Sequence, residues 1–207
     1  MRIVIPLFAH FTALDAIGPY EVLQRLPGAQ VTFAAKERGV VRTDSGVAGL
    51  HADATLDEVD AADILVVPGG PGTRALIRDE EALSWVRAIH ETTRWTTSVC
   101  TGSLVLAAAG LLDGLDATTH WAAVETLEKL GARYTPERVV RRGKLVTAAG
   151  VSAGIDMALA LAALAAGEQV AKALQLAVEY DPQPPFDAGS PAKAGPQVVA
   201  LFAALRG

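Results

Sequence analysis

Short apolar runs alternate along this chain with longer stretches that have helical periodicity. Four runs have the length and the apolar or β-branched composition of buried strands, namely residues 3–8, 30–35, 63–67 and 95–99. Helical patterns begin near Pro19 and cover residues 80–91, 102–110, 153–166 and 197–205. This alternation predicts a mostly parallel sheet with helices on both faces, which is a doubly wound α/β fold.

Two pairs of short β-like segments have the pattern of hairpins. Residues 40–42 and 47–50 flank the turn sequence Asp-Ser-Gly, and residues 139–142 and 144–147 flank Gly143. We expect the first pair to form a small hairpin or an edge excursion and the second to form a hairpin that turns at Gly143.

Composition limits the classes of protein to which the chain can belong. Its 207 residues, 51% of them hydrophobic, predict one core and a single domain over residues 1–207. The net charge of −5 argues against a nucleic-acid surface. The most apolar segment, residues 155–166, is too short to span a bilayer, and the first apolar run is too short for a signal peptide. With one cysteine and no internal disulfide, we expect a soluble cytoplasmic protein without membrane partners.

The lone cysteine lies where a predicted strand meets a predicted helix. Ser98 precedes Cys100 by two positions and Gly102 follows it by two, which is the spacing of a nucleophile elbow with cysteine in place of serine. So sharp a turn brings these two positions close together, so that large side chains there would clash. A helix N-terminus beside the sulfur is expected to lower the thiol pKa. The alternative is that Cys100 is a small buried apolar residue.

A glycine-rich loop follows the third predicted strand. The sequence Pro-Gly-Gly-Pro-Gly at residues 68–72 exposes backbone N–H groups at the carboxyl end of a strand, where α/β sheets bind ligands. The amides of Gly69 and Gly70 are candidates for an oxyanion-type site, and a simple strand-to-helix turn is the alternative. Phosphate binding is disfavoured because the loop lacks a Gly-Lys-Ser/Thr ending and Pro71 removes one donor.

Two carboxylates near the first predicted helix are candidates for acid–base chemistry. Asp15 lies among apolar residues between the first strand and this helix, and a helix N-cap is its alternative role. Glu21 lies further along the helix, and a surface or salt-bridging role is its alternative. Of the two, Asp15 is the stronger candidate.

The histidines do not form a recognisable metal set. The four histidines are His10, His51, His90 and His120. None lies at metal-ligand spacing from another histidine, the cysteine or a carboxylate arranged as a metal set, so we expect no metal site. The residue after Cys100 is Thr101, so no histidine adjoins the sulfur in sequence. His120, in Thr-Thr-His-Trp, is a candidate partner for the cysteine, with capping and packing as the alternative.

Several motifs together resemble the ThiJ/PfpI superfamily, and within it most of all the isocyanide hydratase branch. They are Asp15 with the following Gly-Pro-Tyr-Glu-Val, Val-Val-Pro-Gly-Gly-Pro-Gly, Ser-Val-Cys-Thr-Gly-Ser, Thr-Thr-His-Trp, Gly-Val-Ser-Ala-Gly-Ile-Asp-Met and the proline-rich loop at 179–191. The resemblance covers essentially the whole chain. It implies a flavodoxin-like α/β sandwich, a homodimer, no cofactor, and an elbow cysteine with a strained backbone.

The same resemblance assigns roles to individual residues. It places the family's carboxylate at Asp15 and its oxyanion-type amides at Gly69, Gly70 and the N–H of Thr101. The protease-named branch has histidine directly after the cysteine, so Thr101 argues against a Cys-His protease.

Three functions are open at this point. The first is hydration of isocyanides, as small-molecule substrates, to N-formamides through a covalent thioimidate on Cys100. The second is a glyoxalase or deglycase-type reaction on reactive carbonyls. The third is a non-enzymatic role as a cysteine redox sensor or ligand-binding module.

Overall fold

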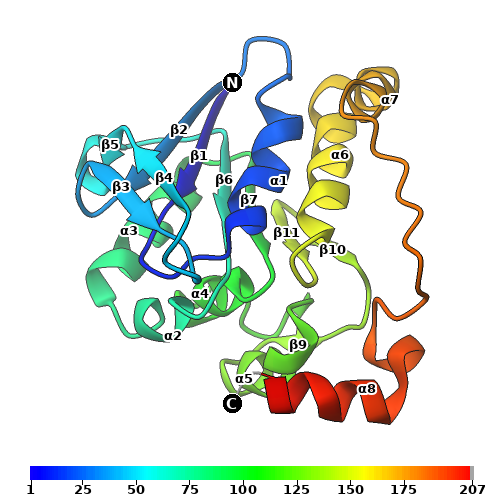
Figure 1. The fold of residues 1–207 in the computed structure, drawn as a ribbon. Helices are drawn as coiled ribbons and strands as arrows, with labels where there is room; N and C mark the ends of the chain where they lie inside the picture. Colours follow the sequence, from blue (N-terminus) through cyan, green and yellow to red (C-terminus); the bar gives the residue numbers. More distant parts are fainter. Residues whose placement is uncertain (206–207) are drawn as a thin grey trace.

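A seven-stranded sheet forms the centre of the computed structural model, which describes residues 1–205 (Figure 1). Its strands lie in the order β10-β11-β7-β6-β1-β2-β5. They are β1 (Arg2–Pro6), β2 (Gln30–Ala35), β5 (Ala54–Thr55), β6 (Ile64–Val67), β7 (Trp95–Val99), β10 (Val139–Arg142) and β11 (Leu145–Ala148). All neighbours pair in parallel except β10 and β11, which form an antiparallel hairpin at one edge.

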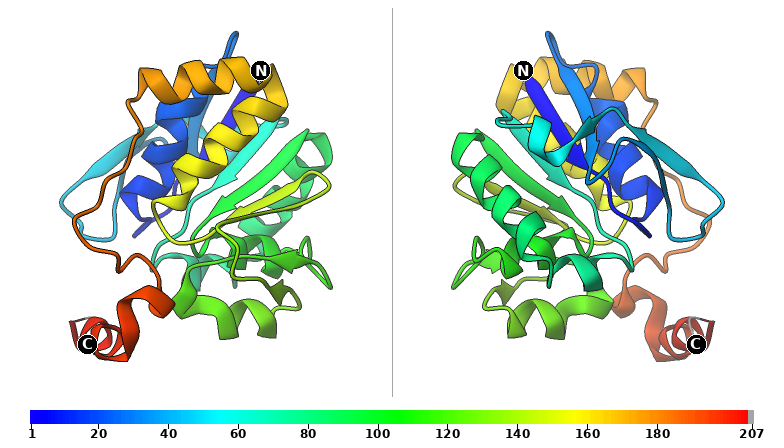
Figure 2. Two further views of the ribbon diagram at one scale, coloured as in Figure 1. Left: turned by 90° about the vertical axis from the view of Figure 1, so that its right-hand side faces the viewer. Right: turned by 90° about the vertical axis from the view of Figure 1, so that its left-hand side faces the viewer.

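Helices cover both faces of this sheet, as Figure 2 shows from opposite sides. One layer contains α1 (Ala13–Leu23), α6 (Ala153–Ala166) and α7 (Glu168–Ala177). The other contains α3 (Glu80–Thr92), α4 (Gly102–Ala108) and α5 (Val124–Lys129), with the short α2 (Thr73–Leu76) beside α4. The predicted α/β fold with a mostly parallel sheet is confirmed.

Alternate residues of one strand enter two separate cores. Ile3 and Ile5 of β1 pack in the cluster that contains α1 and α6, whereas Val4 packs with the helices of the opposite face. The period of two arises because successive side chains of a strand point to opposite sides of the sheet. Continuous apolar runs are thus the signature of strands covered on both faces.

Several smaller elements lie outside the central sheet and its helical layers. The remaining ones are the antiparallel pair β3 (Gly39–Arg42) and β4 (Gly49–Ala52), the parallel pair β8 (Asp116–Ala117) and β9 (Arg133–Tyr134), the 3-10 helices η1 (Leu56–Glu58) and η2 (Trp121–Ala123), and α8 (Pro191–Leu205). Both expected hairpins are therefore present, one as β3–β4 and the other as β10–β11. The last two residues of the expected domain 1–207 lie outside the described residues.

Two helices begin earlier than the sequence predicts. The first begins at Ala13, because Thr12 in an extended conformation serves as its N-cap. Pro19, which we expected in the first turn, therefore lies inside this helix. Proline there removes one backbone donor without ending the helix. The last begins at Pro191 and has a break at Gly195, where φ is 77°.

Within residues 1–205, no helix has both the length and the apolar composition needed to cross a membrane.

Candidate active site

Cys100 occupies a sharp turn between β7 and α4. Its φ of 57° lies in the left-handed region, a conformation that costs residues other than glycine roughly 1–2 kcal/mol. Backbone hydrogen bonds from the Cys100 N–H to the carbonyls of Ala148 and Ala149, at 3.1 and 3.0 Å, hold this conformation. A Cβ at Gly102 would overlap the carbonyl oxygen of Val67, so the second position after the cysteine must be glycine. Cys100 thus lies at a strand–turn–helix junction with a left-handed backbone conformation.

Backbone amides surround the sulfur. The N–H groups of Thr101 and Val151 both hydrogen-bond to it, and the side chain is only 5% exposed. Val151 follows β11 and has a φ of 29°, so a second strained turn faces the cysteine. The carbonyl of Cys100 accepts hydrogen bonds from the hydroxyls of Ser103 and Thr119, both at 3.1 Å. The turn is thus fixed from several sides.

Asp15 lies buried in the first turn of α1, beside the thiol. Its Oδ2 accepts a hydrogen bond of 2.9 Å from the Gly69 N–H, and the residue has no exposed surface. Among the described residues, Oδ1 has no hydrogen-bond partner with good geometry, and the carboxyl interacts with the Cys100 thiol. Because the N-cap of α1 is Thr12, the alternative role of Asp15 as a helix cap does not apply.

Burial dominates the proton affinities of the two groups. It raises the pKa of Asp15 from 3.8 to about 7, against the opposing hydrogen bonds from Gly69 and Cys100. Burial, and then the charge of Asp15, raises the pKa of the Cys100 thiol to about 12, and the amides of Val151 and Thr101 offset only part of this. The expected lowering of the thiol pKa was therefore wrong. The helix-end amides are present, but desolvation and a neighbouring carboxylate outweigh them.

The two groups titrate as a pair, because a charge on either one raises the pKa of the other. The first proton leaves the pair near pH 7 and the second only in strongly alkaline solution. Above pH 7 the pair of Asp15 and Cys100 holds one proton and one negative charge. Moving that proton from sulfur to carboxylate creates a thiolate with an acid beside it. The site can therefore supply a nucleophile and a proton donor together.

The glycine loop after β6 orients this pair. Besides the Gly69–Asp15 bond, the Gly70 N–H donates to the Thr101 hydroxyl at 2.9 Å. A Cβ on Gly69 would come within 2.5 Å of the Thr101 nitrogen and 2.8 Å of Asp15 Oδ2. Both amides thus have hydrogen-bond partners inside the protein. They hold the carboxylate and the threonine in place.

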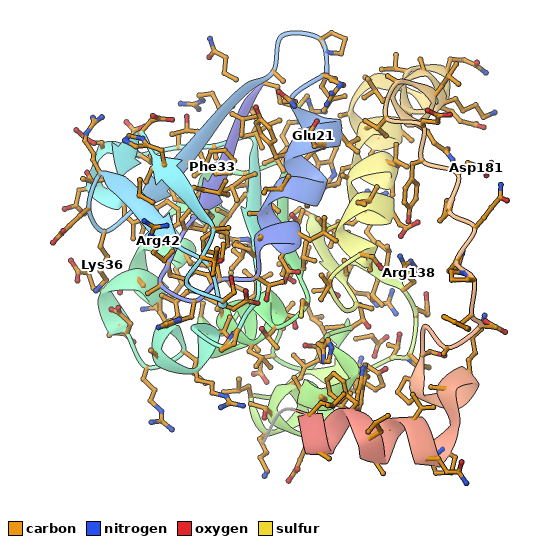
Figure 3. All side chains as sticks on the ribbon, in the orientation of Figure 1. Glu21, Phe33, Lys36, Arg42, Arg138 and Asp181 are labelled. Atoms are coloured by element: carbon orange, nitrogen blue, oxygen red, sulfur yellow. The ribbon has the colours of Figure 1, made fainter. Side chains whose placement is uncertain are left out.

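The other two candidates, Glu21 and His120, have partners of their own. Glu21 lies towards the C-terminal end of α1, on the surface, and forms an ion pair with Arg25 at 2.7 Å (Figure 3). His120 caps η2, its Nδ1 accepting from the Ala122 N–H at 3.2 Å. Its ring packs against Gly150, where a Cβ would lie 2.8 Å from the ring. His120 is therefore a neighbour of the Val151 turn and serves as a cap.

Two contacts of the cysteine escaped sequence reasoning. The Val151 amide and the Thr119 hydroxyl come from segments 51 and 19 residues further along the chain. A signal for the first exists, since Gly150-Val151 follows a strand and precedes a helix, as Cys100 does.

Within residues 1–205, no three or more His, Cys, Asp or Glu side chains are grouped so that they could hold a metal ion.

Asp15→Asn should lower the pKa of Cys100, because the amide removes both the negative charge beside the thiol and the acceptor of its proton. The rate of alkylation by iodoacetamide, measured against pH, reports the thiolate because Cys100 is the only cysteine. The control Glu21→Gln, which changes a surface carboxylate, should leave the profile unchanged. If the midpoint of the alkylation profile of Asp15→Asn lies at the same pH as that of the wild type, or at a higher pH, Asp15 does not raise the pKa of Cys100.

The chain is similar to known proteins in sequence and in fold. The DJ-1/PfpI family model matches residues 1–164. The chain is 46% identical over 193 residues to the isonitrile hydratase of Pseudomonas putida, covering 93% of this chain and 84% of that protein. It is 28% identical over 149 residues to the deglycase PfpI of Pyrococcus furiosus, covering 71% and 89%. The crystal structure of a ThiJ/PfpI family protein from Pseudomonas syringae, 37% identical, matches with a TM-score of 0.94 over 99% of this chain and 85% of that one. The chain belongs to the DJ-1/PfpI family.

Proposed function

We propose that this protein is an enzyme that hydrates isocyanides to N-formamides, with Cys100 as nucleophile and Asp15 as acid–base residue. The observation that carries the proposal is the buried thiol–carboxyl pair, in a chain 46% identical to an isonitrile hydratase over most of its length. Hydration of an isocyanide needs a nucleophile for its terminal carbon, a proton for that carbon, and then proton transfer from water to the nitrogen. The pair supplies both from adjacent side chains.

In the first half-reaction, the sulfur forms a bond to the terminal carbon of R–N≡C. The thiol proton passes to Asp15 and then to this carbon, which gives the thioimidate R–N=CH–S–Cys100. No external acid or oxidant is consumed. The amides of Thr101 and Val151, which hydrogen-bond to the sulfur, stabilise its negative charge while the proton is on the carboxyl.

In the second half-reaction, water adds to the thioimidate carbon. Asp15 accepts one proton from the water and passes it to the nitrogen, which gives a tetrahedral adduct with an O–H group. The C–S bond then breaks to release R–NH–CHO, and the remaining proton of the water passes from this O–H group through Asp15 to the sulfur, so that the pair regains its starting state. The unpaired Oδ1 of Asp15 is the oxygen available for the water, since Oδ2 is held by Gly69.

Reaction on reactive carbonyls is the second candidate, because the chain is also similar to a deglycase. The same two residues could serve it, with sulfur attacking a carbonyl carbon. A role as redox sensor is less well supported. Oxidation of cysteine requires thiolate, and burial raises the pKa of this thiol.

Asp15→Asn should lower the rate of formamide production from an aryl or alkyl isocyanide by about 100- to 10,000-fold, the usual contribution of a general acid–base residue. Cys100→Ser should be folded and inactive. Glu21→Gln, the matched carboxylate on the same helix, should keep wild-type turnover.

Methylglyoxal consumption, measured beside formamide release, distinguishes the two substrate classes. If the wild type consumes methylglyoxal and leaves isocyanides unchanged, the hydratase proposal is wrong. If Asp15→Asn keeps the wild-type rate, Asp15 is not the acid–base residue.

We also propose that the chain forms a homodimer through the outer face of α1 and α6. Leu14 is 40% exposed there, next to a hollow of about 330 Å³. Its lining is mostly apolar and includes Leu14, Ile17, Ile155, Val178 and Tyr180, with Glu21 and Arg25. An exposed apolar face with complementary charges on it suits contact with a second copy.

Leu14→Arg should convert the dimer to a monomer, because it places a charge in the proposed interface. Sedimentation measures the change, and Leu176→Arg is the control, since Leu176 is 80% exposed on α7 outside this face. A wild-type protein that sediments as a monomer at micromolar concentration would refute the dimer.

A further inference from the structure

The C-terminal helix reaches the rest of the protein through an aromatic contact. The rings of Trp121 and Phe202 lie 5.1 Å apart, and the Trp121 ring is stacked on His120 at 5.5 Å. None of the described residues of α8 is buried. The extended segment 180–190 carries α8 past α6 to lie beside α5 and β9, as both figures show (Figures 1 and 2). A helix with so little burial depends on the few side chains that contact the body.

The two residues before Trp121 contact the turns at Cys100 and Val151. Two residues before it, the Thr119 hydroxyl donates to the carbonyl of Cys100 at 3.1 Å. One residue before it, the ring of His120 packs on Gly150, and the next amide, that of Val151, hydrogen-bonds to the sulfur. Trp121 therefore directly follows two residues that contact the Cys100 turn and the Gly150–Val151 turn.

We propose that Trp121 and Phe202 form an aromatic wall that receives the N-substituent of the isocyanide and favours aromatic substituents. This specificity rests on the proposed function. The C≡N–R group is linear and reacts at its terminal carbon, so the substituent is held away from the sulfur by the length of that group. Thr119 and His120 contact the Cys100 and Val151 turns, so a wall that begins at the next residue, Trp121, is placed for the substituent.

The position of the wall along the chain fits a role in specificity. The family match ends at residue 164, so Phe202 lies outside the part of the chain that the family model covers. The thiol, the carboxyl and the glycine loop all lie within it. Phe202 would thus add substrate selection from outside the matched segment, while Trp121 lies within that segment with the chemistry. Aromatic rings prefer aromatic partners in tilted or offset arrangements, and the Trp121–Phe202 pair is tilted at 53°.

The test compares two reagents with the same reactive group, iodoacetanilide and iodoacetamide, at Cys100. Each alkylation rate is divided by the rate of the same reagent with glutathione. The wild type should favour the anilide. In Phe202→Ala and Phe202→Leu, the ratio of anilide to amide should fall by roughly 2- to 12-fold, the range of an aromatic contact. Loss of thiol reactivity alone would affect both reagents equally and leave the ratio unchanged.

Leu201→Ala is the matched control, on the same helix and 58% exposed, and it should keep the wild-type ratio. An unchanged ratio in both Phe202 variants, or an equal fall in Leu201→Ala, would overturn the aromatic wall. Alkylation needs the thiol and no isocyanide, so this outcome is independent of whether the hydratase proposal holds. If it holds, Phe202→Leu should also raise the KM for phenyl isocyanide and leave that for methyl isocyanide unchanged.

Discussion

The burial of one carboxyl beside one thiol is the constraint on which the rest of this site depends. A carboxylate without full hydrogen bonding is costly inside a protein, so Asp15 keeps its proton up to a pH of about 7. The Gly69 amide satisfies one of its oxygens and leaves the other facing the site. Surface carboxylates such as Glu21 have solvent and a cation instead, and cannot share a proton with the thiol.

The sheet brings this pair together because its central strands run parallel. Asp15, Gly69 and Cys100 follow β1, β6 and β7, which are neighbours, so all three lie at one edge. Close packing of backbone then fixes the details. Side chains at Gly69 or Gly102 would collide with Thr101 or with the Val67 carbonyl, so these glycines permit the approach of loops to the elbow.

Sequence reasoning picked out the thiol and the carboxyl that the structure brings together, but it misjudged the pKa of the thiol. The apolar runs and the Ser-x-Cys-x-Gly spacing predicted the parallel sheet and the turn at Cys100, since both follow from local periodicity and sterics. The thiol pKa depends on which groups are buried together, and this is a property of tertiary packing. For the same reason, the Val151 amide was missed and the glycine amides were expected to be open to a ligand.

Infrared difference spectroscopy of wild type minus Asp15→Asn, recorded against pH, tests the shared proton most directly. The C=O stretch of a protonated carboxyl identifies Asp15 with its proton bound. We expect this band to be present at pH 5 and to disappear with a midpoint of about 7, as burial of the carboxyl beside Cys100 requires. A midpoint near the ordinary value of 3.8 would mean that Asp15 is ionised throughout the neutral range, and would contradict the account.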